Sequence, residues 1–290
     1  MSHLKYSPCG WGEKALPGAF TLVELLVVIS IISLLMSIMM PSLIKAREQA
    51  NRLDCMNNMR QLTLVWTIYA HDNDGKLCSS ETRWIDEEYS LPCPYAYGEP
   101  HWVIGGPTGH LYPFNHIGDS EIAITEGVLW PYIENLELYR CKSDHSDKLR
   151  SYSMSNTMGG QPTEVDLNRQ WQFHDIANIS RSAERLVFVC AQSEGRWLSG
   201  GFFPMRYDDK ETIRWGNPKA HPPGWREGLK ITARHSDGSN ISFADGHCQW
   251  WRYKDPRTVK LANGELFITD PVNEGNVDLE YLAELLKGDH

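Results

Sequence analysis

The sequence predicts an α+β protein in which a long N-terminal helix, membrane-spanning in its first half, packs on an antiparallel β-sheet head. Two observations carry this prediction. An apolar run with a single charge fills residues 20–41, and helix-forming sequence continues from there to residue 71. Near the other end, residues 231–252 have the pattern of antiparallel β-strands joined by turns that contain Gly and Asp.

The apolar run has the length of a membrane span. As a helix it rises about 31 Å, close to the roughly 30 Å hydrocarbon core of a bilayer. Glu24 is its only charged residue, and a carboxylate is unfavourable in hydrocarbon. The small residues Gly18 and Ala19 precede the run, whereas a cleaved secretory signal places small residues after it. We therefore expect the apolar helix to remain in the mature protein.

The segment FTLVELLVVISII, preceded by small residues and a short Lys-bearing leader, resembles the prepilin signal of type IV pilins and type II secretion pseudopilins. Counted from Phe20, Glu24 is the fifth residue and Pro41 the twenty-second, where that family has Glu and a helix-kinking Pro. The resemblance implies that a prepilin peptidase removes residues 1–19 and that Phe20 is then N-methylated.

The residue before the cut departs from the family pattern. The family usually has Gly there, whereas this chain has Ala19, with Gly18 one position earlier. A cut between Ala19 and Phe20 keeps Glu24 at the fifth place and is preferred. A cut after Gly18, which would move Glu24 to the sixth place, is the alternative.

The resemblance implies a structural subunit of a type IV pilus or a type II secretion pseudopilus, and no enzyme. It gives Glu24 a partner, the N-terminal amine at Phe20 of the neighbouring subunit, which would compensate the buried charge. The implied partners are prepilin peptidase, other pilin or pseudopilin subunits and the assembly platform. The implied location is the bacterial inner membrane, crossed once, with the head outside the cytoplasm. The alternative is a membrane-anchored extracytoplasmic protein that binds a ligand or glycan and forms no filament.

Beyond Pro41 the helix is expected to kink and continue, because apolar residues keep three-and-four spacing as far as the sequence HDNDG. Residues 42–71 would be its extracytoplasmic half, and residues 72–290 the globular head. Asp72, Asn73 and Asp74 offer oxygen ligands of the kind that calcium takes, but the full EF-hand spacing is absent. A helix-ending turn is favoured there over calcium, and no other cofactor is expected.

In the head, His235 is followed after nine residues by Asp245 and Gly246. This H-x9-DG pattern resembles one attached to a large group of prepilin-type proteins. The residues themselves predict an antiparallel hairpin in which Asp245 and Gly246 form a turn and His235 hydrogen-bonds across it. A second turn is expected at 236–240.

Three further segments of the head have a predicted form. The apolar segment ERLVFVC, residues 184–190, predicts a buried strand. An aromatic, Gly-rich loop insertion spans 195–228, and its Trp and Tyr residues would either bind a sugar or partner or pack on the sheet. Residues 277–287 predict a short amphipathic helix with Asn276 as its cap.

The formal net charge of the chain is -9, and the acidic excess lies beyond residue 70, which argues against a nucleic-acid partner. Of seven cysteines, one precedes the expected cut, and an even number remains in a domain expected outside the cytosol. Disulfides are therefore expected, with Cys55–Cys141 and Cys190–Cys248 as the suggested pairs. None of these cysteines has the CxxC spacing of a zinc site, and spacing reveals no Ser-His-Asp or Cys-His arrangement.

Overall fold

The computed structural model describes residues 21–80, 100–103, 121–159, 172–191, 205–207, 213–215, 231–266 and 273–286. The expected leader, residues 1–19 with Gly18 and Ala19, and the following residue Phe20 lie outside these ranges. Most of the 195–228 insertion lies outside them as well. The chain divides into two compact units, residues 1–47 and residues 48–290. The second is called the C-terminal unit below.

Helix α1 runs from Leu22 to Asp72, 51 residues in all, and contains Pro41 without ending there. In the C-terminal unit one stripe of α1 is buried, with spacings of three and four residues between its members: Cys55, Met59, Leu62, Val65, Trp66, Tyr69 and Ala70. This is the periodicity of a helix that lays one face on a core. The helix ends in a turn where Asp74 and Gly75 have φ of 55° and 86°.

The main sheet has four strands in the order β1-β2-β5-β6, all antiparallel to their neighbours. They are β1 Tyr152–Met154, β2 Leu186–Cys190, β5 Gly238–Phe243 and β6 Cys248–Arg252. A separate antiparallel pair is formed by β3 Met205–Tyr207 and β4 Ile213–Trp215. A long apolar helix with an antiparallel sheet is the α+β class that the sequence predicts, and that class is confirmed.

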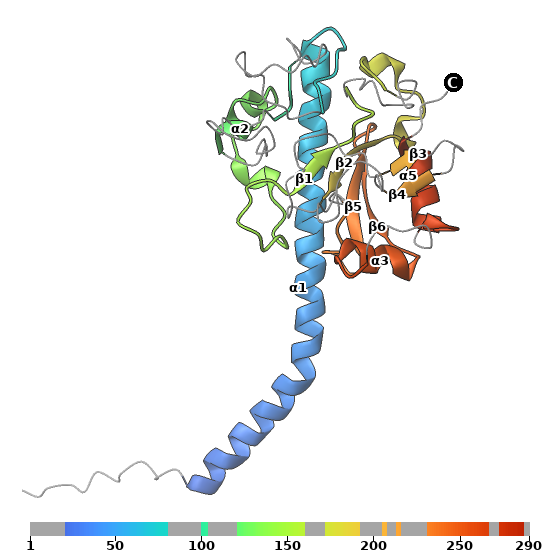
Figure 1. Ribbon diagram of the computed structural model, residues 1–290. Coiled ribbons are helices and arrows are strands. Elements are labelled where there is room, and N and C mark those ends of the chain that lie inside the picture. Colours follow the sequence, from blue (N-terminus) through green and yellow to red (C-terminus); the bar gives the residue numbers. More distant parts are fainter. Residues whose placement is uncertain are drawn as a thin grey trace, which may run out of the picture. The chain divides into compact units, whose positions relative to one another are not determined.

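The sheet is the middle layer of the C-terminal unit (Figure 1). One face packs on α1, and the aromatic rings of Trp66, Tyr152 and Phe188 lie in that core. The other face packs on α5 Val277–Leu286 and α3 Pro256–Ala262, through Ile241, Trp251 and Leu282 among others. Shorter helical elements flank these layers: α2 Glu121–Thr125, η1 Trp130–Tyr132, η2 Leu136–Tyr139, η4 Ile176–Asn178 and η5 Ser182–Glu184.

The β5–β6 hairpin turns where the sequence expects it, with Gly246 at a φ of +89° and Gly246 N–H donating to Phe243 O at 2.9 Å. The turn that precedes β5 is shorter than the turn expected at residues 236–240. It uses Ser236 and Asp237, both at positive φ, and β5 already begins at Gly238. Gly238 has to be glycine for space, since a Cβ there would lie 2.4 Å from Trp251 O.

Polar contacts join α1 to the sheet inside this core. The Thr63 hydroxyl lies 2.7 Å from Ser242 Oγ, which in turn accepts from Phe188 N–H at 3.1 Å. Asn240 Nδ2 donates to Arg52 O at 2.9 Å. These bonds satisfy buried polar atoms and fix how α1 lies along β5.

Two leucines test the packing of α1, because they differ in burial and not in chemistry. Leu62 is fully buried and Leu64, two residues later, is 58% exposed. We expect Leu62→Ala to lower the free energy of unfolding by about 2–5 kcal/mol, since it removes buried methylenes and leaves a cavity. Leu64→Ala should change it by no more than about 0.5 kcal/mol. Denaturant unfolding of the detergent-solubilised chain measures both, and equal losses would contradict this burial pattern.

Candidate functional site

The first half of α1 is a candidate membrane span by length and composition. Every large apolar side chain from Leu22 to Ile44 is exposed within the chain. Glu24 lies in the opening turn of this helix, and Pro41 lies near the end of the apolar stretch. Such a surface is stable in lipid or against other apolar helices and unfavourable in water.

Glu24 takes part in a reciprocal capping arrangement with Thr21. Thr21 N–H and Thr21 Oγ1 donate to Glu24 Oε2 at 2.8 and 2.7 Å, and Glu24 N–H lies 3.2 Å from Thr21 Oγ1. This is a capping box, in which Thr and a Glu three residues later satisfy donors at a helix start. The sequence TLVE, Thr21 to Glu24, carries the signature of this motif.

The acidic turn after α1 serves to end the helix. Gly75 N–H donates to Ala70 O at 2.8 Å, and Asn73 Nδ2 donates to Tyr69 O at 2.8 Å. Asp72 Oδ2 accepts from the Tyr132 hydroxyl at 3.1 Å. A helix-ending turn is the role that the sequence favours over calcium for Asp72, Asn73 and Asp74.

A different group of side chains converges in the described part of the C-terminal unit. The ligand atoms of Cys55, Cys141, Cys190 and His235 all lie within 4.8 Å of one another. We call this group the Cys3His cluster. It is the one place among the described residues where at least three His, Cys, Asp or Glu side chains come together in this way.

Each member of the Cys3His cluster comes from a different segment. Cys55 lies on α1, and Cys141 is the second residue after η2. Cys190 is the last residue of β2, and His235 stands just before β5. All four are fully buried, with at most 1% of any residue exposed.

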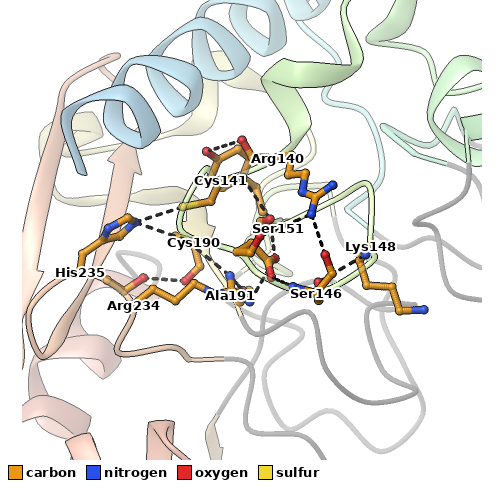
Figure 2. Close-up of polar contacts among 12 residues, drawn as sticks. Arg140, Cys141, Ser146, Lys148, Ser151, Cys190, Ala191, Arg234 and His235 are labelled. Atoms are coloured by element: carbon orange, nitrogen blue, oxygen red, sulfur yellow. Dashed lines mark hydrogen bonds and ion pairs between the residues drawn. The ribbon is translucent and has the colours of Figure 1, made fainter. Parts of the chain in front are cut away.

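The histidine ring faces the sulfur atoms, as Figure 2 shows. His235 Nε2 lies 3.3 Å from Cys141 Sγ and 3.9 Å from Cys190 Sγ. The other ring nitrogen, Nδ1, is buried without a hydrogen-bond partner, so the polar contacts of the ring are directed at the cluster. The backbone of His235 is held by Trp250, whose Nε1–H donates to His235 O at 2.8 Å.

A network of polar contacts beside the cluster reaches Cys141 and Cys190 (Figure 2). Arg234 forms a 3.1 Å ion pair with Asp144, whose Oδ2 accepts from Ser151 Oγ at 2.6 Å. Ser151 Oγ in turn accepts from Cys141 N–H at 3.1 Å. Arg234 Nη1 also lies 3.9 Å from Cys190 Sγ. The network places a cation beside the sulfurs and ties the segments of Cys141 and His235 together.

The three thiols differ in acidity. The pKa of Cys141 is lowered, chiefly because Cys190 and Cys55 hydrogen-bond to its sulfur, and His235 adds to the effect. The hydrogen bond to Cys141 raises the pKa of Cys190, and burial raises that of Cys55.

The suggested disulfides are not present in the structure. Cys55, Cys78, Cys141, Cys190 and Cys248 are all free thiols in the described part of the chain. The pair Cys190–Cys248 is wrong for a topological reason. Strand β5 lies between β2 and β6, which separates the two by about 10 Å, beyond the reach of a disulfide. Cys55 and Cys141 do lie together, but with Cys190 and His235 as further neighbours.

The residues of the H-x9-DG pattern have separate places in the structure. The ring of His235 belongs to the Cys3His cluster, whereas Asp245 and Gly246 form the β5–β6 turn. Asp245 Oδ1 accepts from both the backbone N–H and the ring of His247, at 3.0 and 2.6 Å. The Cys141–His235 contact is a Cys-His arrangement that spacing did not reveal. Its complete burial leaves no room for a substrate at the sulfur, which speaks against a nucleophilic role.

No protein-family model, no curated protein and no solved structure matches this chain.

The buried ion pair beside the cluster gives a stability prediction. Asp144 and Arg234 side chains are 2% and 14% exposed, whereas Arg181 and Glu184 form a pair that is more than half exposed. Arg234→Ala should lower the free energy of unfolding by about 3 kcal/mol, because it leaves the Asp144 carboxylate buried without its cation. Arg181→Ala, the control, should lower it by less than about 1 kcal/mol. Similar losses in denaturant unfolding for both variants would show that burial of the pair has no such effect.

Proposed function

We propose that this chain is a pilin-like structural subunit, anchored in the bacterial inner membrane by the first half of α1 and assembled through it into a type IV pilus or a type II secretion pseudopilus. The observation that carries the proposal is a lone carboxylate, Glu24, in the first turn of a helix whose apolar side chains are exposed as far as Ile44. So large an apolar surface needs lipid or other apolar helices to cover it.

Processing by a prepilin peptidase agrees with the residues at the helix start. A cut between Ala19 and Phe20 would leave Thr21 as the second residue, so the capping box with Glu24 would survive in the mature chain. N-methylation of Phe20 would keep a positive amine next to the membrane helix. The carboxylate and the amine would then both be available in every subunit.

The carboxylate of Glu24 could accept a hydrogen bond from such an amine through its second oxygen, Oε1. In the part of the chain that the structure describes, both hydrogen bonds to its carboxylate end on Oε2, and none ends on Oε1. An ammonium from the Phe20 end of a neighbouring subunit would compensate the charge in the low-dielectric surroundings. A single buried ionic contact of this kind sets the axial register between helices that are otherwise uniformly apolar.

The C-terminal unit would form the part of the subunit outside the cytoplasm. Its stretch of α1 already has the buried stripe of a packed helix from Cys55 onward, so the folded head begins soon after the apolar run. The partners of this proposal are prepilin peptidase, the other filament subunits and their assembly platform.

The proposed processing predicts a definite N-terminus. Protein extracted from the membrane of a bacterium with a prepilin peptidase should begin at N-methylated Phe20 and lack residues 1–19, because the peptidase cuts before the apolar helix. Intact mass and N-terminal sequencing measure this. A start at Ala19 would move the cut, and an uncut chain that begins at Met1 would overturn the proposal.

Substitutions of Glu24 separate filament docking from helix capping, because glutamine also completes a capping box but carries no charge. We expect Glu24→Gln to lower incorporation into filaments by at least about tenfold, which corresponds to about 1.4 kcal/mol. Glu24→Ala should be at least as defective. The measurement is the ratio of sheared or crosslinked filament to membrane pool, in cells with equal subunit levels.

The matched control is Thr21→Val, which removes the capping hydroxyl and keeps the carboxylate. It should assemble nearly normally if docking is the role of Glu24. Normal assembly of Glu24→Gln together with failure of Thr21→Val would instead assign Glu24 to capping alone.

A further inference from the structure

We propose that the Cys3His cluster of Cys55, Cys141, Cys190 and His235 binds one Zn²⁺ ion as a closed structural site. Three sulfur atoms and one imidazole nitrogen are a donor set that zinc takes in tetrahedral structural sites. The proposal concerns the C-terminal unit alone and does not depend on filament assembly.

The geometry of the donors is close to that of a tetrahedral zinc site. With bonds of about 2.3 Å to sulfur and about 2.0 Å to nitrogen, the ligand atoms of such a site lie roughly 3.5–3.8 Å from one another. All four ligand atoms of the cluster lie within 4.8 Å of one another, and His235 Nε2 lies 3.3 and 3.9 Å from two of the sulfurs. The bound of 4.8 Å exceeds the tetrahedral separation by about 1 Å, so shifts of up to roughly half an ångström in each side chain would complete the coordination.

A disulfide explains this arrangement less well than a metal does. A disulfide would consume two of the three cysteines and leave the third thiol and the imidazole together without a common partner. The ring of His235 has no reason to face the sulfurs in a disulfide, whereas a metal needs its Nε2 there. Convergence of four donors from four segments is what a single ion would require.

The surroundings suit a charged site. Zinc with three thiolates and a neutral imidazole carries a net negative charge, and Arg234 stands beside Cys190 Sγ at 3.9 Å. The Asp144 carboxylate holds this guanidinium in place, and its link through Ser151 to the backbone of Cys141 orients a second ligand. Cysteine binds zinc as the thiolate, so zinc binding would release protons from the free thiols.

Burial assigns the site a structural role. A catalytic zinc keeps an open position for water or substrate, whereas here all four ligands are fully buried and all four come from the protein. One ion would connect α1, the segment after η2, the end of β2 and the residue that opens the H-x9-DG pattern. It would therefore hold the helix to the sheet at a point near the start of the C-terminal unit.

The test is the metal content of the full chain, extracted in detergent and purified without chelators or added metal. Elemental analysis should find about one zinc per chain. Replacement of the zinc by cobalt(II) should give the absorption of a tetrahedral site with sulfur-to-cobalt charge transfer. Removal of the zinc should lower the temperature of unfolding, and readdition of zinc should restore it.

Variants identify the ligands. Cys141→Ser and His235→Ala should each lose most of the bound zinc. Cys248→Ser should keep it, since Cys248 lies on β6 and outside the cluster. A Cys78→Ser control covers the loss of a buried thiol, because Cys78 is also fully buried and is no member of the cluster.

The wild-type chain also gives a readout that does not depend on the folding of variants. Denaturation with an alkylating agent and no reductant should label Cys55, Cys141 and Cys190 in peptide mass analysis, which shows that they are thiols. A chain without zinc, a disulfide between any two of these cysteines, or a stoichiometric metal other than zinc would each overturn the proposal, as would unchanged zinc in Cys141→Ser and His235→Ala.

Discussion

The packing of α1 against β1 and β2 is the interaction on which the C-terminal unit depends. Trp66 and Met59 are fully buried between the helix and the sheet, together with Tyr152 and Phe188 from the strands. The other face of the sheet is covered by α3 and α5, which follow later in the chain. Without the helix, one face of the sheet would expose its large aromatic side chains to water, and an antiparallel sheet with an uncovered apolar face is unstable or aggregates.

A single helix can serve both a bilayer and this core because its backbone hydrogen bonds are satisfied within the helix in either surroundings. What changes along α1 is therefore only the side-chain pattern. Up to Ile44 the apolar residues surround the helix, as a bilayer allows, and from Cys55 they form one buried stripe, as a sheet requires. Pro41 does not end the helix between these two patterns. Proline has no backbone N–H, so the helix lacks one hydrogen bond at Pro41. The hydrogen bonds of the turns before and after Pro41 keep the helix continuous there.

The parts of the fold that depend on residues close together in the sequence could be predicted from it. The length of α1, the buried strand at 184–190, the turn at Gly246 and the cap at Asn276 all follow from spacing and turn chemistry within a few residues. The Cys3His cluster has no such signal, because 180 residues separate its first and last members and only the packing of α1 and the connecting segments on the sheet brings them together. The wrong pair Cys190–Cys248 has the same origin, since sequence does not reveal that β5 lies between the two strands. The capping box of Thr21 and Glu24 differs, because its signature is local and was readable.

Buried polar groups on α1 matter more for position than for stability. A helix surface of Leu, Ile and Val gives nearly the same apolar contact after a shift of one turn, so apolar packing alone leaves the register of such a helix poorly defined. Thr63 and Cys55 remove that freedom on the sheet side, because a one-turn shift would separate Thr63 from Ser242 and Cys55 from Cys141, leaving polar groups buried without partners. In the proposed filament, Glu24 would do the same between subunits, since its carboxylate would be compensated only where a neighbour's amine lies. In each case a few polar atoms, costly when unpaired, select one arrangement among many that the apolar surface would tolerate.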